Sequence, residues 1–155
     1  MKIRLRNRTV LVGLLFALAL PLASKVYASG PFATSYSNAS LTGVYGYSLD
    51  GWGSTNRGGV LNTSLDVVGV MWFDGNGNFA FHDTVDLGGT LFQRGIADNP
   101  IVGTYNVNPD GTGTMQFVVS GTTHTRAFVI VAAGTELQLG NADSLATNRG
   151  VAKKQ

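Results

Sequence analysis

The sequence contains no cysteine, and histidine is almost as scarce, with only His82 and His124. The lack of cysteine excludes disulfides, thiolate metal sites, iron–sulfur clusters and thiol catalysis. The two histidines form no HxH or HExxH motif, so a zinc site would need help from carboxylates. We therefore expect no metal site and no cofactor, and we assign no catalytic residue.

A helical period is also missing beyond residue 30, where glycine, threonine, valine, asparagine and aromatic residues dominate. These residues favour strands joined by tight turns. The turn signals are strong, with DGNG at 74–77 and NPDG at 108–111. Strands are predicted over residues 41–52, 64–73, 78–87, 90–96, 102–107, 112–120, 123–132, 136–141 and 150–153.

This spacing predicts an all-β domain, a single antiparallel up-and-down barrel of about eight strands, with a β-sandwich as the alternative. Consecutive tight hairpins favour the barrel. Closure also removes the unpaired edges that an exported sheet must otherwise protect. An eight-stranded barrel is either filled by its own side chains or wide enough for one small ligand.

The first 28 residues differ from the rest and are predicted to be a signal peptide. Four basic residues precede an apolar run over 10–20, and Val26-Tyr27-Ala28 matches the small-x-small cleavage pattern. The run is shorter than the roughly 20 residues that span a bilayer. We expect cleavage after Ala28, a secreted or periplasmic protein, a flexible leader over 29–40 and a barrel domain over 41–155.

Removal of that segment would reverse the net charge. The whole chain carries eleven basic and nine acidic residues, a formal charge of +2. Five of the basic residues precede residue 29, whereas all nine acids follow it, so six against nine leaves −3. A mildly acidic domain indicates no nucleic-acid partner, and we expect no membrane span after processing.

The predicted strand over 78–87 places a carboxylate among apolar side chains. Phe79, Phe81, Val85 and Leu87 share a face with Asp83, whereas His82 points to the opposite side. A buried carboxylate without a partner costs several kcal/mol. Asp83 should therefore pair with Arg94 or Arg126 or line a cavity, unless a bulge brings it into water.

Aromatic residues recur on the same faces of several predicted strands and would fill the interior or line a lipophilic pocket. The second possibility gives a candidate ligand-binding set of Asp83, Phe81, Tyr45, Tyr47, Tyr105 and Arg126. The ligand would be small and hydrophobic.

Some strands are apolar on both faces, since Val68, Val70 and Trp72 alternate with core residues. A second apolar face indicates a covered outer surface, such as a homo-oligomer interface. An outer-membrane barrel would also cover it. The strands are short, however, and no aromatic girdle repeats among them, so the pattern does not favour an outer-membrane barrel.

The mature part also resembles a known type of protein. The stretches LTGVYGYSLDG (41–51), MWFDGNGNF (71–79), VGTYNVNPDGTGTM (102–115), FVIVAAGTELQL (128–139) and GVAKKQ (150–155) are similar to a family of secreted bacterial all-β proteins of uncharacterised function. That family's architecture resembles small lipocalin-like or allene-oxide-cyclase-like barrels. The resemblance implies a barrel and a hydrophobic ligand, and it carries over no catalytic residue.

Three functions are consistent with these observations. The first is a non-enzymatic barrel that binds a small apolar ligand or a protein partner. The second is a barrel enzyme of the cyclase or isomerase type, with Asp83 and a histidine in its cavity. The third is a structural surface or matrix protein whose outer apolar face makes the contacts.

Overall fold

The computed structural model describes residues 35–53, 61–144 and 146–155, and the predicted signal peptide with its cleavage site lies outside these ranges. They form two single-turn 3-10 helices and the strands β1 (Thr42–Gly53), β2 (Thr63–Asp74), β3 (Asn78–Leu87), β4 (Thr90–Arg94), β5 (Ile101–Val107), β6 (Thr112–Val119), β7 (Thr122–Val131), β8 (Glu136–Asn141) and β9 (Ala146–Lys154). No helix within the described ranges is both long and apolar enough to cross a membrane.

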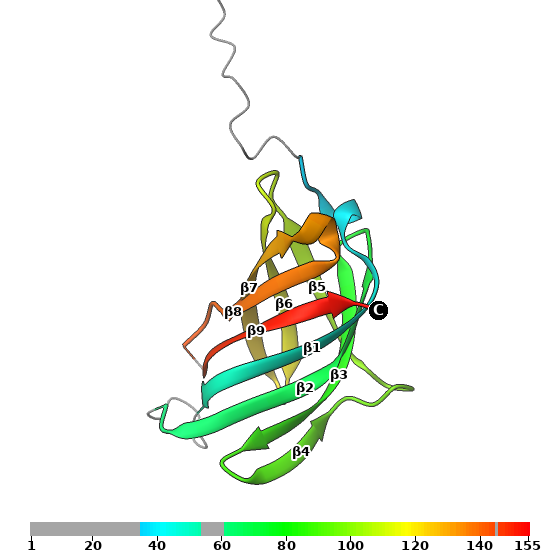
Figure 1. Ribbon diagram of the computed structural model, residues 1–155. Coiled ribbons are helices and arrows are strands. Elements are labelled where there is room, and N and C mark those ends of the chain that lie inside the picture. The colour runs from blue at the N-terminus through cyan, green and yellow to red at the C-terminus, as the bar shows by residue number, and fades with distance from the viewer. Residues whose placement is uncertain (1–34, 54–60, 145) are drawn as a thin grey trace, which may run out of the picture. The chain divides into compact units, whose positions relative to one another are not determined.

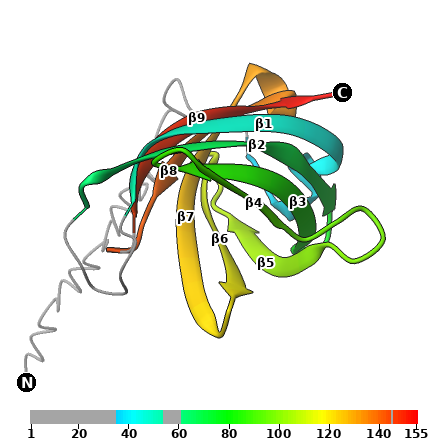
Figure 2. The ribbon, with the colours of Figure 1, turned by 90° about the horizontal axis from the view of Figure 1, so that it is seen from below.

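Eight of these strands close into an antiparallel barrel, which confirms the predicted fold class. The hydrogen-bonded order is β2-β1-β9-β8-β7-β6-β5-β3, and β2 also pairs with β3 and so completes the ring (Figures 1 and 2). The remaining strand, β4, is an addition to the ring and lies at its lower end in Figure 1. Closure leaves β4 as the strand with a free edge in the described part of the chain.

Strand β3 changes its neighbour midway along its length. Its first half pairs with β5, ending at Phe81 opposite Ile101, and its second half pairs with β4, beginning at Asp83 opposite Arg94. Gly95 lets the chain leave at this fork, because it has a φ of 66° and a Cβ there would lie 3.1 Å from the Phe81 carbonyl oxygen. Asp83 and Arg94 therefore mark the point where β4 parts from the barrel wall.

The barrel interior is largely aromatic. The Phe73 ring contacts Tyr45 and Tyr105 edge-on, at centroid distances of 5.3 and 5.1 Å, and stacks on Phe79 at 5.8 Å. Each such pair adds roughly 0.5–1.5 kcal/mol to what burial alone contributes. The series continues along the interior through Phe79, Phe81 and Phe117.

One end of the barrel is sealed by the segment that precedes β1, and we call it the η1 end after the 3-10 turn Asn38–Ser40. The Tyr105 hydroxyl donates to the carbonyl oxygens of Asn38 and Leu41, at 2.9 and 3.1 Å. The Asn38 side chain accepts the Val107 amide at 2.8 Å, and Leu41 is fully buried. Residues 35–40, which the sequence analysis assigned to the leader, thus help to close this end of the barrel.

The outer face carries the apolar residues that the sequence placed there. Val68 is 64% exposed, and the cross-strand partners Val44 and Trp72 are 38% and 48% exposed. Three shallow hollows of about 470, 400 and 400 Å³ meet at Val68 on the outside of β1, β2 and β3. An oligomer interface at this surface stays a prediction.

Candidate functional site

The half of the interior opposite the η1 end contains buried polar side chains, and we call it the β4 end. Asp83 on β3 is 4% exposed and accepts two hydrogen bonds from Arg94, from Nε at 2.8 Å and from Nη2 at 2.5 Å. The Tyr47 hydroxyl of β1 also donates to Asp83. Both carboxylate oxygens are therefore occupied, and the pairing with Arg94 is one of the two that the sequence suggested.

A glycine allows this contact between strands that are not neighbours. Gly69 on β2 lies between Tyr47 on β1 and Asp83 on β3 in the register of the sheet. A Cβ at Gly69 would lie 2.5 Å from the Asp83 Cβ and 2.5 Å from the His82 carbonyl oxygen. The absent side chain therefore leaves the interior space through which the Tyr47 hydroxyl reaches Asp83.

A second guanidinium lies in the same region of the interior. Arg126 on β7 is 5% exposed, and its Cζ lies 5.4 Å from the centroid of the Phe117 ring. Arg94 lies in the same way over Phe81, at 5.8 Å, and the two phenyl rings contact each other at 4.8 Å. Each ring of the Phe81–Phe117 pair thus has one guanidinium over its face, an arrangement that the negative faces of aromatic rings stabilise.

Burial shifts the pKa of the groups that face these arginines. It raises the pKa of Tyr47 far above its ordinary value, with the negative charge of Asp83 as the next cause. Tyr47 therefore stays neutral and offers Arg126 no negative charge. Burial likewise lowers the pKa of Arg126, whereas Tyr47, which is hydrogen-bonded to it, and the negative charge of Asp83 have the opposite effect.

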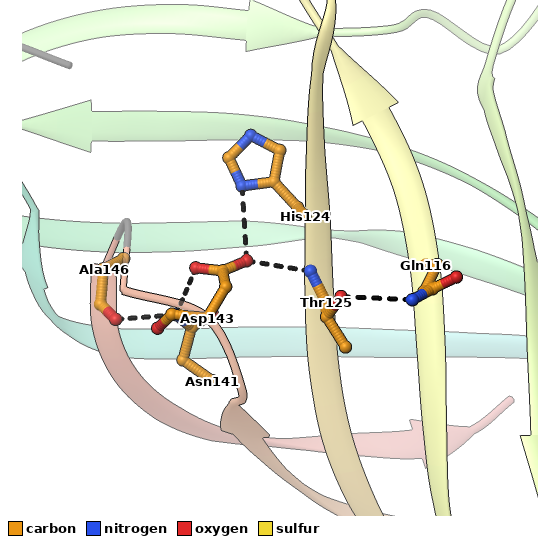
Figure 3. Close-up of polar contacts among 6 residues, drawn as sticks. All are labelled: Gln116, His124, Thr125, Asn141, Asp143 and Ala146. Atoms are coloured by element: carbon orange, nitrogen blue, oxygen red, sulfur yellow. Dashed lines mark hydrogen bonds and ion pairs between the residues drawn. The ribbon is translucent and has the colours of Figure 1, made fainter. Parts of the chain in front are cut away.

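The rim of the β4 end is organised around Asp143, in the turn between β8 and β9 (Figure 3). Its Oδ2 accepts the Thr125 amide at 2.8 Å and lies 3.8 Å from Nδ1 of His124. The Asn141 side chain donates to the Ala146 carbonyl oxygen at 2.6 Å and so closes the turn. Burial lowers the pKa of His124, although Asp143 opposes this shift, so the imidazole is neutral at pH 7.

Asn148 on β9 is a buried polar residue that sequence reasoning missed. It is 8% exposed, and its buried Oδ1 has no hydrogen-bond partner among the described residues. The predicted strand began at residue 150, whereas β9 begins at Ala146, so the inward position of Asn148 was not considered. Alternation with Ala152, which is buried, would have identified it.

Four of the six predicted ligand-binding residues meet at the β4 end, namely Asp83, Phe81, Tyr47 and Arg126. Tyr45 and Tyr105 do not join them. Tyr105 bonds to the η1 segment, and the Tyr45 hydroxyl donates to the Gly134 carbonyl oxygen at 2.5 Å. These two tyrosines fasten loops to the barrel at the η1 end.

His82 lies on the outer face, where it borders one of the shallow hollows, and so it points away from the interior. Its neighbour in sequence, Asp83, points inward, as strand alternation requires. Within the described ranges, no group of three or more histidine, aspartate or glutamate side chains is arranged to hold a metal ion.

Comparisons with protein-family models, with curated proteins and with solved structures found no match. The barrel that the sequence resemblance implied is confirmed by the structure. The family itself stays a prediction, so the function has to be argued from the site.

Substitutions at the buried ion pair should show strong coupling. Loss of one partner leaves a buried charge uncompensated, so Asp83→Asn should lower the free energy of unfolding by about 3–5 kcal/mol. Asp83→Leu and Arg94→Leu together should destabilise by less than the sum of the two, with a coupling energy of at least about 1 kcal/mol. Urea denaturation of the four proteins of the cycle measures this.

The exposed pair of Arg149 and Asp50, 3.6 Å apart, is the matched control. Its side chains are 87% and 65% exposed, so its coupling energy should be about 0.5 kcal/mol or less. Equal coupling in the two pairs would contradict the buried position of Asp83 and Arg94.

The raised pKa of Tyr47 makes stability fall at high pH. The unfolded chain loses the tyrosine proton near pH 10.0, whereas the folded protein keeps it. The contribution of Tyr47 is therefore fully present below pH 10.0 and is lost as the pH rises further, by up to about 1.4 kcal/mol per pH unit. Urea denaturation at several pH values above 10 measures how the free energy of unfolding declines with pH. This decline should be less steep in Tyr47→Phe, by the slope that corresponds to about one proton. Equal slopes in the two proteins would show that Tyr47 ionises freely in the folded state.

Proposed function

We propose that the protein is an exported, non-enzymatic binding protein whose barrel takes a small, largely apolar ligand at the β4 end. The observation that supports this most strongly is the group of buried polar side chains beside the Phe81–Phe117 pair. Apolar walls with a few convergent polar groups are typical of ligand sites, and the mouths of β-barrels are a common place for them. The predicted signal peptide supports the location.

The contrast between the two ends of the barrel supports binding over a purely structural role. The η1 end contains aromatic and aliphatic side chains whose few polar groups are bonded to the backbone. The β4 end buries Arg126 and Asp83 and partly buries Arg94, although apolar side chains of the same volume are often as stabilising as buried charges or more so. Such departures from the best packing are expected at functional sites.

The geometry argues against the enzymatic alternative. A general base must reach the proton that it removes, but both oxygens of Asp83 are bonded to Arg94 and Tyr47. His82 lies on the outside of the barrel. His124 is inside the barrel, but it is paired with Asp143 at the rim.

Binding can be measured with the neutral fluorophore N-phenylnaphthylamine and the protein expressed from its full-length chain. Saturable binding with one equivalent is expected. Phe117→Leu, which keeps an apolar side chain but removes the ring under Arg126, should weaken binding roughly tenfold, the equivalent of about 1.4 kcal/mol. Trp72→Leu, on the outer face, is the matched control and should leave the affinity unchanged.

Two outcomes would contradict the proposal. Absence of saturable binding would mean that the interior is filled by its own side chains. Loss of binding in Trp72→Leu but not in Phe117→Leu would move the site to the outer apolar face, where a role in contacts between macromolecules would be the better explanation.

A further inference from the structure

We infer that the ligand carries an anionic head group, and that Arg126 binds it. This inference rests on the proposed function and names the chemical class of the ligand, an organic acid with an apolar body. It comes from the balance of charge inside the barrel and from the position of Arg126 beside Phe117.

Arg126 has a buried charge that forms no ion pair with a carboxylate among the described residues; it is hydrogen-bonded to the neutral Tyr47, and Asp83 attracts it from beyond ion-pair distance. Its residue is 5% exposed, yet it takes part in none of the ion pairs among the described residues. The nine acidic residues of the chain all lie in the described ranges, so no carboxylate is hidden in the remainder. A buried charge without a partner costs several kcal/mol.

The one carboxylate buried in this interior is already committed elsewhere. Asp83 accepts two hydrogen bonds from Arg94 and one from Tyr47, and these use both of its oxygens. Asp143, at the rim, accepts the Thr125 amide and faces His124. Asp83 balances the charge of the partly buried Arg94, so the group of Tyr47, Asp83, Arg94 and Arg126 keeps one positive charge in excess.

The surroundings of Arg126 favour an acid with an apolar body. A guanidinium binds a carboxylate through a planar fork of donors, and such charge-assisted bonds are the strong ones. Phe117 lies against the same guanidinium, and Phe81 against Phe117, so aromatic surface continues directly from the charged group. A cationic ligand would face two arginines at this place.

Asn148 contributes an unsatisfied hydrogen-bond acceptor to the β4 end. Its Oδ1 is a buried acceptor without a partner among the described residues. A buried acceptor of this kind gains stability from a donor on a ligand or from a water molecule that the ligand encloses. A hydroxyl on the acid, or one ordered water beside it, would satisfy it.

The test compares decanoate, decanol and decylamine, which share one chain length and differ in the charge of the head group. Each competes with N-phenylnaphthylamine for the protein expressed from its full-length chain. Decanoate should bind roughly tenfold or more tighter than decanol, as expected for one hydrogen-bonded charged pair, and decylamine weakest. Arg126→Gln should abolish the preference for decanoate, whereas Arg126→Lys should keep part of it.

Arg149→Gln is the matched control, because it removes one positive charge from a side chain that is 87% exposed. It should leave the preference unchanged. If Arg126→Gln does not fold, the order of the three competitors on the unaltered protein still decides, since equal affinities or a preference for decylamine would overturn the inference. Failure of the fluorophore itself to bind would instead overturn the proposed function.

Discussion

The contact on which the rest of the structure depends is the ion pair of Asp83 with Arg94. It joins β3 to β4 at the point where β3 ceases to pair with β5, so it holds the extra strand against the barrel. It also decides the charge balance of the interior. Because Arg94 and Tyr47 occupy the carboxylate of Asp83, Arg126 forms no ion pair of its own among the described residues.

This constraint divides the interior into two chemically different halves. The η1 end is sealed by Leu41 and by tyrosine hydroxyls bonded to backbone carbonyl oxygens. The aromatic series then continues along the barrel to Phe81 and Phe117, whose rings contact the guanidinium groups of Arg94 and Arg126. One half therefore stabilises the fold, and the other departs from the packing that stability alone would favour.

Much of this arrangement was predictable from residue types and spacing. Turn signals such as DGNG at 74–77 located the hairpins, because glycine accepts the positive φ that tight turns need, as at Gly75 and Gly77. Strand alternation placed Asp83 in the interior, and the cost of an unpaired carboxylate pointed to an arginine partner. Alternation also places Arg126 on the same face as Phe128 and Ile130.

The remainder depends on contacts between segments distant in sequence. The choice between Arg94 and Arg126 as partner of Asp83 is an exception, because β3 and β4 form a hairpin with the two-residue turn Gly88-Gly89, whose register places Asp83 opposite Arg94. The sequence pattern does not distinguish Tyr45 and Tyr105 from Tyr47. Their hydroxyls donate hydrogen bonds to the carbonyl oxygens of Gly134 and Asn38, which lie far away in the chain. The inward position of Asn148 was not predicted, because the first residues of β9 include few β-branched or aromatic residues that would indicate a strand.

The central claim is that a guanidinium without a carboxylate partner lies inside the barrel and binds an acid. The most direct test is a crystal structure of the protein purified from its own host. The account predicts Arg126 within the barrel, beside Phe117, with electron density for an acidic group or an ordered anion against its guanidinium. An interior filled by side chains, with Arg126 turned to solvent or paired with a carboxylate of the chain, would contradict it.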